Sequence, residues 1–416
     1  MFEIKGRIST AICYATVVEE AAVEQIRRMC DYELTAGSRV RIMPDVHAGK
    51  GCTIGTTMTV TDKVCPNIVG VDIGCGMYTV KLEDKELDFE KIDEAAHYIP
   101  SGMNTWEGRT ERFGLEELRC YRSLSDTKRL ERSLGTLGGG NHFIEIDRAA
   151  DGTYYLVIHS GSRNLGKQVA EIYQQLAVDL HAGKADYFAR RDEIISTYKA
   201  EGRRGEIQET LKALEKEYKA KNPDVPEDLC WLYGSFLEDY LHDVEICQRF
   251  ARRSREKMAE ILLARTGMTG TEAFHTIHNY IDTEEMILRK GAIAAHAGEK
   301  VLIPINMRNG SVIAIGKGNP EWNFSAPHGA GRIMSKTKAK EAIDLAAYKA
   351  AMEGIYTTSV NESTLDEAPM AYKSLDDIID VIRDSVDIID IMKPVYNFKA
   401  GDEDLPWQKK KADRPE

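Results

Sequence analysis

Glycine-rich turns that separate short β-rich runs constrain the fold of this chain more than any other feature. Up to about residue 165, runs such as MYTVKL and TYYLVIHS alternate with these turns, and TVVEEAAVEQIRRMCDY supplies one early amphipathic helix. The pattern becomes helical from Leu165 to about Thr266, and EMILRKGAIAAHAGEKVLIPINMRNGSVIAIGKG then returns to short strands. Short runs bounded by glycine are typical of strands, whereas the central spacing is typical of helices. This order predicts an α+β fold.

Two segments differ from the expected strand-and-turn body. Within residues 182–228, apolar residues recur at helical spacing in a charged stretch, which predicts a solvated helical hairpin inserted in the fold. Near the end, SLDDIIDVIRDSVDIIDIM (374–392) predicts a closing amphipathic helix, and the polar tail 402–416 is expected to be loose. We find no internal repeat and no convincing linker, so we expect one large domain over residues 1–416.

The composition is that of an ordinary globular protein, with 43% hydrophobic and 29% charged residues. No apolar run approaches the ~20 residues that a membrane helix needs, so we expect no membrane partner. The start MFEIKGRIST lacks a secretory pattern and the eight cysteines form no CxxC pair, which predicts reduced thiols and a cytoplasmic location. A net charge of -12 argues against wholesale wrapping of nucleic acid but leaves room for a local basic groove.

The stretch VGVDIGCGM places a carboxylate, Asp72, three residues before a thiol, Cys75, in a glycine-rich turn. Such a turn lets ions approach the backbone closely, and a thiolate can bridge two cations. On this motif alone, a capping aspartate beside an inert buried cysteine explains the residues equally well. Six of the ten histidines favour the metal hypothesis because they lie in segments rich in glycine, asparagine or serine. These are His47, His142, His159, His275, His278 and His328.

Several glycine-rich segments also indicate phosphate binding. GTLGGGNH and HGAGR can present backbone N–H groups to an anion, and Arg332 adds a guanidinium suited to bidentate contact. GSRNLGKQ matches most of a P-loop, but Gln168 replaces the hydroxyl that a P-loop needs, which argues against one. The K-x-D-G signature of ligases with a lysine nucleophile is missing from the sequence. If a nucleotide is attached covalently, a histidine flanked by small residues is a reasonable nucleophile.

The ordered set PDVHAGKG, GVDIGCGM, GTLGGGNHFIE, HSGSRNLG, HNY, RKGA, HGAGRIMSK and PMAYK resembles the RtcB family of RNA ligases over about residues 40–399. The resemblance implies a single α+β domain with mixed β-sheets around two divalent cations, typically Mn²⁺. It implies GTP-dependent joining of RNA 3′-phosphate or 2′,3′-cyclic phosphate ends to 5′-hydroxyl ends, in tRNA splicing or RNA repair. The implied chemistry passes through a guanylated histidine and an RNA-ppG end. Whether an activating protein is needed is left open.

The same resemblance implies roles for individual residues. One metal is expected to be held by Asp72, Cys75 and His142, and the other by Cys75, His159 and His278. His328 is expected to attack GTP. The expected guanylate-binding residues are Asn141, Glu145, Asn306, Ser311, Tyr372 and Lys399. The candidates for RNA phosphates are Arg163, Arg332 and Lys336. Asp45 and His47, in PDVH, are expected to contact a metal ligand and orient it rather than to bind the metal themselves.

Two positions depart from the family pattern. Asn306 stands where many members have serine, and Lys336 replaces the last arginine of HGAGRxxSR, which keeps the charge but loses the bidentate fork. Histidine and thiolate ligands suggest zinc at least as readily as manganese on softness alone, so the manganese prediction rests on the resemblance. Two alternative functions stay open: a two-metal phosphoesterase without covalent nucleotide, and an RNA-end binding protein with a vestigial site.

Overall fold

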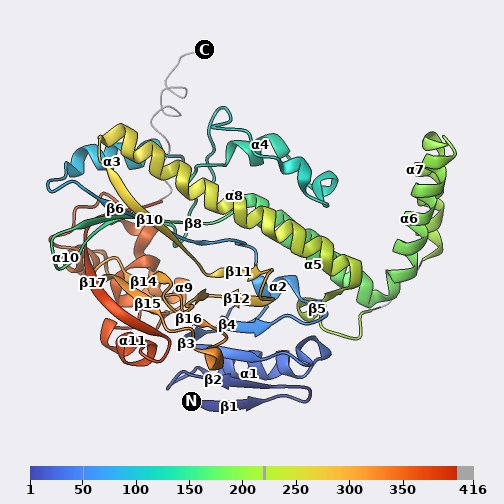
Figure 1. Cartoon of the computed structure of the whole chain (residues 1–416), viewed down its shortest axis with the longest axis horizontal. Coiled ribbons are helices and arrows are strands. Elements are labelled where there is room, and N and C mark those ends of the chain that lie inside the picture. Colours follow the sequence, from blue (N-terminus) through green and yellow to red (C-terminus); the bar gives the residue numbers. More distant parts are fainter. Residues whose placement is uncertain (50, 219–221, 401–416) are drawn as a thin grey trace.

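Two β-sheets form the frame of the molecule. The computed structural model describes residues 1–49, 51–218 and 222–400, so the tail predicted at 402–416 lies outside the described residues. In Figure 1, the strands of the six-stranded sheet lie in the lower half and those of the seven-stranded sheet at the left and above. The six-stranded sheet has the order β1 (Phe2–Lys5), β2 (Thr10–Cys13), β3 (Val40–His47), β4 (Ile54–Thr59), β12 (Ile287–Lys290) and β11 (Asn279–Asp282). The seven-stranded sheet has the order β10 (Gly270–Ile277), β6 (Gly76–Leu82), β8 (Tyr154–Ser160), β7 (Phe143–Arg148), β17 (Val386–Lys399), β15 (Gly310–Gly316) and β14 (Lys300–Asn306).

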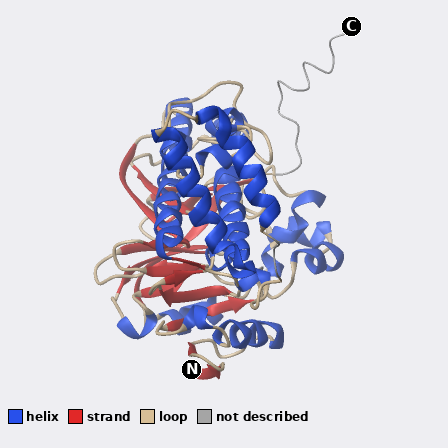
Figure 2. Ribbon diagram, turned by 90° about the vertical axis from the view of Figure 1, so that its right-hand side faces the viewer, coloured by secondary structure: helices blue, strands red, loops and turns tan. Residues whose placement is uncertain are grey.

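Helices and two short ribbons complete a mixed α/β domain, which agrees with the α+β prediction. One ribbon pairs β13 (Ala292–Ala294) with β16 (Ser325–Pro327), and the other pairs β5 (Lys63–Val64) with β9 (Leu232–Tyr233). Most helices lie together beside the strands in Figure 2. The α-helices of the described residues are α1 (Glu20–Cys30), α2 (Pro66–Val69), α3 (Phe89–Tyr98), α4 (Thr127–Arg132), α5 (Arg163–Asp179), α6 (Ala185–Ala200), α7 (Ile207–Glu217), α8 (Gly234–Thr266), α9 (Lys336–Ala342), α10 (Leu345–Ala351) and α11 (Leu375–Ile382). Within the described ranges, even the 33-residue α8 fails the combination of length and apolar character that a membrane crossing requires.

The seven-stranded sheet buries side chains on both of its faces. Along β8, Leu156 and Ile158 pack in a cluster with residues of α3 and α8, whereas Val157 packs on the other face with Met77 and Leu302. Successive side chains of a strand point to opposite faces, so a strand buried on both faces is apolar throughout. This explains why TYYLVIHS is one of the clearest β-rich runs of the sequence.

Helix α8 crosses the seven-stranded sheet diagonally in Figure 1 and holds two turns of the chain in place. The side chain of Arg255, in its middle, is fully buried. One terminal nitrogen of this guanidinium donates to the carbonyl oxygens of Gly74 and Ser160, each at 2.7 Å. The helix therefore fixes the main chain at the start of β6 and at the end of β8.

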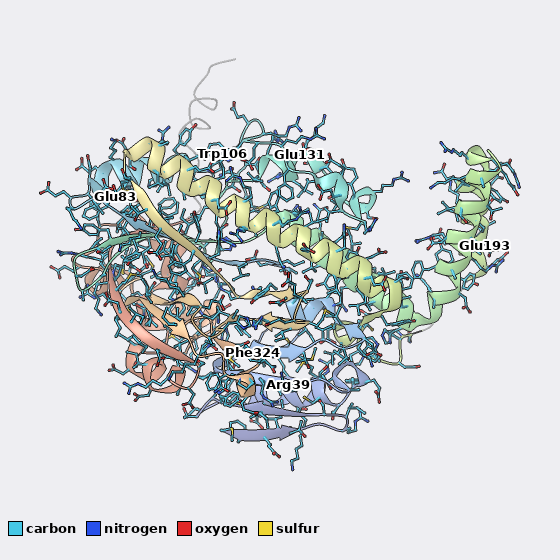
Figure 3. All side chains as sticks on the ribbon, in the orientation of Figure 1. Arg39, Glu83, Trp106, Glu131, Glu193 and Phe324 are labelled. Atoms are coloured by element: carbon cyan, nitrogen blue, oxygen red, sulfur yellow. The ribbon has the colours of Figure 1, made fainter. Side chains whose placement is uncertain are left out.

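Helices α6 and α7 extend away from the sheets in Figure 1, within the range 182–228 for which the sequence predicts a hairpin. Glu193, labelled in Figure 3, marks this projecting part. The two helices contact each other through the rings of Tyr187 and Tyr218, whose centroids are 5.5 Å apart, and through an ion pair between Arg190 and Glu217. Residues 219–221 of the range lie outside the described residues.

The helix predicted over residues 374–392 is wrong in its second half. Helix α11 ends at Ile382, and β17 begins at Val386. The residues VDIIDIM have an apolar spacing compatible with a helix, but they are rich in β-branched isoleucine and valine. Their main chain pairs with β15, with Met392 opposite Ser311. Tertiary pairing with an existing sheet thus decides the structure of a short segment that is ambiguous in sequence.

Candidate metal and nucleotide site

The turn that carries Asp72 and Cys75 lies between α2 and β6, against α8. Its tightest point is Gly74, which has a positive φ of 75°. A Cβ at this position would lie 2.9 Å from the Cβ of Ala251 on α8. Only glycine meets both the conformational and the steric demand there. The Cys75 N–H donates to the Asp72 carbonyl oxygen at 3.2 Å, which closes the turn and brings the two side chains together.

Three histidines lie close to Asp72 and Cys75 because each is at or next to an end of a strand, and these strand ends are on the same side of the sheet. His142 directly precedes β7, His159 is the second-last residue of β8, and His278 follows β10. The strands β10, β6, β8 and β7 are adjacent in the sheet, and His159 pairs with Phe143 on one side and with Met77 on the other. His278 is also where the chain passes from the seven-stranded sheet to β11 of the six-stranded sheet.

The donor atoms of these five residues form two groups that share Cys75. One group contains Asp72, Cys75 and His142, and the other contains Cys75, His159 and His278, with all donor atoms of a group within 4.8 Å of one another. The Cys75 Sγ lies 3.5 Å from His142 Nε2 and 3.3 Å from His159 Nε2. These are the two sets that the family resemblance implies.

The chemistry of the two groups fits divalent cations. His159 Nδ1 lies 3.1 Å from the Asn141 carbonyl oxygen, which only accepts, so Nδ1 carries the proton and Nε2 presents a lone pair. His159 Nε2 lies 3.4 Å from His278 Nε2 and 3.3 Å from the Cys75 sulfur. Burial lowers the pKa of His159 and of His278, which keeps both rings neutral. Converging neutral imidazoles beside a carboxylate and a thiol are suitable ligands for a cation.

The thiol and the carboxylate of the turn respond to their surroundings in opposite ways. Burial and the nearby Asp72 carboxylate raise the pKa of the Cys75 thiol well above its usual value. Burial acts to raise the pKa of Asp72, but the contact with His142 at 3.1 Å, together with Cys75 and the charge of Arg163, lowers the net pKa to about 2. A cation held by this group would reverse the thiol's preference, because metal ligation favours the thiolate.

His328 lies next to the second ligand group. It follows β16, and its ring centroid lies 5.0 Å from that of His278. The fully buried Asp45 carboxylate contacts His328 Nδ1 at 2.7 Å and accepts from the His328 main-chain N–H at 3.2 Å. The Nδ1 proton therefore points at Asp45 and leaves a lone pair on Nε2. Asp45 thus orients His328, whereas the sequence predicted that it orients a metal ligand.

A cavity of about 260 Å³ adjoins these side chains. Two of the metal-ligand candidates and His328 line it, together with most of the residues predicted to bind guanylate or phosphate. The predicted guanylate- and phosphate-binding residues in the lining are Asn141, Glu145, Asn306, Tyr372, Lys399, Arg332 and Lys336, and His47 lines the cavity as well.

Two of the residues predicted to bind guanylate or phosphate do not line the cavity. Ser311 is fully buried, and Arg163 donates to the Gly102 carbonyl oxygen at 2.6 Å and to Thr136 Oγ1 at 3.2 Å.

The two departures from the family pattern occupy different roles in this cavity. The Asn306 side-chain oxygen accepts from the main-chain N–H groups of Arg308 and Asn309, so it closes the turn between β14 and β15. Only its amide nitrogen is left for a ligand. Lys336 begins α9, and its ammonium lies 3.0 Å from Glu367.

Glu367 is the main site residue that sequence reasoning missed. Its carboxylate accepts from Lys399 Nζ at 3.0 Å and from the Tyr372 hydroxyl at 2.6 Å, and it contacts Arg332 and Lys336 at 3.4 and 3.0 Å. Four residues predicted to bind nucleotide or RNA phosphate therefore converge on one buried carboxylate. The only signal in the sequence was an acidic pair, Asp366 and Glu367, shortly before PMAYK.

Replacing Glu367 with glutamine is expected to destabilise the protein at neutral pH by about 3 to 5 kcal/mol, because it leaves the largely buried Arg332 and Lys399 without their counter-charge. Burial acts to raise the pKa of Glu367, but the ammonium groups of Lys399 and Lys336 lower it far below its ordinary value of 4.5. A depressed pKa contributes stability above pH 4.5 that is lost as the pH falls further. Urea unfolding should therefore show a gap between wild type and Glu367→Gln at pH 7 that narrows below pH 4. An equal gap at both pH values would contradict this account.

A second buried carboxylate pair lies on β7. Burial raises the pKa of Glu145 and raises that of Asp147 to about 6. Glu145 lines the cavity and accepts from the Asn397 amide at 2.6 Å, whereas neither oxygen of Asp147 has a hydrogen-bond partner in the described residues. Glu145 is therefore the carboxyl group that this wall of the cavity presents to a ligand.

The strand ends carry two groups of candidate ligands, next to an imidazole held by a carboxylate and a cavity lined by cationic side chains. This arrangement is suited to divalent cations and phosphate groups. A family model described as tRNA-splicing ligase RtcB matches residues 25–121 and 101–400. RNA-splicing ligase RtcB of Escherichia coli K12 is 30% identical over 404 residues, which cover 87% of this chain and 90% of that protein. The tRNA-splicing ligases RtcB of Archaeoglobus fulgidus and Aeropyrum pernix are 28% and 26% identical, covering 88% and 82% of this chain and 88% and 83% of their own lengths. The chain belongs to the RtcB family.

Proposed function

We propose that this protein is an RNA ligase that uses GTP to join RNA 3′-phosphate or 2′,3′-cyclic phosphate ends to 5′-hydroxyl ends. Membership of the RtcB family supports the class of reaction. The observation that carries the mechanism is His328, held by Asp45 beside the two ligand groups and lining the cavity. The natural setting is RNA repair or tRNA splicing, and a cytoplasmic location agrees with eight free cysteines.

The proposed reaction begins with attack of His328 Nε2 on the α-phosphorus of GTP. The new N–P bond replaces the bond to pyrophosphate, which leaves with the electron pair, and Asp45 stabilises the positive charge that develops on the ring. An oxygen of the RNA 3′-phosphate then takes GMP from the histidine, which gives RNA-ppG. Finally the 5′-hydroxyl oxygen attacks the RNA phosphorus and expels GMP. Two divalent cations in the groups around Cys75, Mn²⁺ by family resemblance, would polarise the reacting phosphates.

The walls of the cavity supply the binding of GTP in this proposal. Glu145 would accept from the N1 and N2 hydrogens of guanine, and adenine would leave this buried carboxylate unpaired, which disfavours ATP by several kcal/mol. Arg332, Lys336 and Lys399 already neutralise Glu367 and would also attract the phosphates. The segment 182–228 is proposed as an inserted helical hairpin outside this chemistry.

A joining assay tests the proposal directly. An RNA that ends in a 2′,3′-cyclic phosphate is mixed with a 5′-hydroxyl RNA and Mn²⁺, with either GTP or ATP. We expect a joined product with GTP but not with ATP, and an acid-labile protein–GMP adduct when the α-phosphate of GTP is labelled. Release of phosphate without an adduct would favour a two-metal phosphoesterase. Binding of the RNA end without turnover in any divalent metal would favour a vestigial RNA-end binding protein.

A further inference from the structure

His47, the last residue of β3, adds an imidazole to the wall of the cavity beside those of His159, His278 and His328. Its Nδ1 lies 3.0 Å from the Asp45 carbonyl oxygen. A carbonyl oxygen only accepts, so Nδ1 carries the proton and Nε2 holds a lone pair. This ring belongs to neither ligand group around Cys75, and no hydrogen-bond partner of its Nε2 is found among the described residues. His47 therefore brings an uncommitted base to the place where RNA ends would react.

Asp45 holds two rings, and it holds them with different chemical groups. Its carboxylate contacts His328 Nδ1 at 2.7 Å, whereas its main-chain carbonyl contacts His47 Nδ1. A carboxylate stabilises an imidazolium far more than a neutral carbonyl does. Burial lowers the pKa of His47, and the neighbouring His328 lowers it further, against the opposing effects of Asp45 and Glu19. The two imidazoles are thus set for different tasks: one for bonding to phosphorus, the other for accepting a proton.

The joining step needs such a base. A 5′-hydroxyl must lose its proton as its oxygen bonds to phosphorus, whereas the attack by His328 needs no base because Nε2 already has a lone pair. The other carboxyl groups of the cavity have different roles. Glu145 is assigned to guanine in the proposed function, and Glu367 is surrounded by four donors.

We propose that His47 is the general base of the RNA-joining step, an inference that rests on the proposed function. As the bond between the 5′ oxygen and the RNA phosphorus forms, the hydroxyl proton moves to His47 Nε2. The bond from that phosphorus to GMP breaks, and GMP leaves with the electron pair. The His47 imidazolium then releases its proton to water, which restores the base.

The test isolates this step by supplying RNA that already carries the 3′-ppG end, made with the wild-type protein in the absence of 5′-hydroxyl RNA. Joining is measured in a single turnover with wild type, His47→Ala and His47→Asn. Asparagine keeps a side-chain N–H for the Asp45 carbonyl but cannot take up a proton. We expect both variants to join about 10² to 10⁴ times more slowly, the range typical of a lost general base. Added imidazole should partly restore His47→Ala.

The matched control is His296→Ala, which removes a partly exposed histidine that pairs with Glu285 and is not among the residues lining the cavity. It should join at the wild-type rate. The part of the acid limb of the wild-type pH–rate profile that reflects protonation of His47 should also disappear in His47→Asn, because asparagine does not take up a proton. Joining by His47→Asn within about twofold of wild type would overturn the proposal, as would slow joining by His47→Ala that imidazole does not restore. Failure of the wild-type protein to form RNA-ppG would instead refute the proposed function itself.

Discussion

Replacing His328 with alanine is expected to abolish both the protein–GMP adduct and RNA joining, with a loss of at least about 10⁴-fold in rate. The reason is that no other imidazole in the described cavity has its Nδ1 against a carboxylate, as His328 has against Asp45. The measurement is transfer of label from the α-phosphate of GTP to the protein, followed by gel electrophoresis and acid treatment.

The control for this result is again His296→Ala, which should form the adduct as wild type does. RNA that already carries the 3′-ppG end sharpens the conclusion, because the joining step does not use His328 as a nucleophile. The His328→Ala variant should therefore recover part of its joining with that RNA. An adduct that survives in His328→Ala would place the nucleophile elsewhere and would refute the mechanism.

Replacing Cys75 with alanine is expected to remove both metal ions, because this residue alone belongs to both ligand groups. Each group would retain two protein ligands, too few to hold a divalent cation firmly. We expect the metal content after gel filtration to fall from about two ions per chain to fewer than one, and joining to fall by at least about 10³-fold. Elemental analysis by mass spectrometry measures the first effect, and the joining assay measures the second.

A comparison among three variants gives this prediction its sharpest form. His278 belongs to one ligand group only, so His278→Ala should retain about one ion per chain. Cys230 is a buried cysteine outside both groups, and Cys230→Ala should retain two. Two ions bound to Cys75→Ala would exclude the shared thiolate, even if activity were lost.

The grouping of the ligand candidates could be inferred from sequence because each lies in a recognisable local motif. Asp72 and Cys75 share one turn, while His142, His159 and His278 lie at or near the ends of β-rich runs. Strand ends that meet at one sheet edge bring such residues together without further information. The assignment of individual residues to each metal came from the resemblance and stays a prediction.

The parts that sequence did not predict depend on contacts between distant segments. Asp45 and His328 are 283 residues apart, and Glu367 lies 31 residues from Lys336 and 32 from Lys399. Periodicity and spacing report only on neighbours along the chain, so such pairs leave no local trace. The helix prediction for residues 374–392 failed in its second half for the same reason, because pairing with β15, a distant strand, makes these residues a strand.

The buried guanidinium of Arg255 has a consequence for how the metal ligands are spaced. Gly74 directly precedes Cys75 and Ser160 directly follows His159, and a single nitrogen of Arg255 holds the carbonyl oxygens of both. The separation between the sulfur and the imidazole is therefore set by the fold itself. This preorganisation would spare the binding of an ion the entropic cost of assembling its ligands. Sequence variation in the middle of a long helix would then tune metal affinity without touching a coordinating atom.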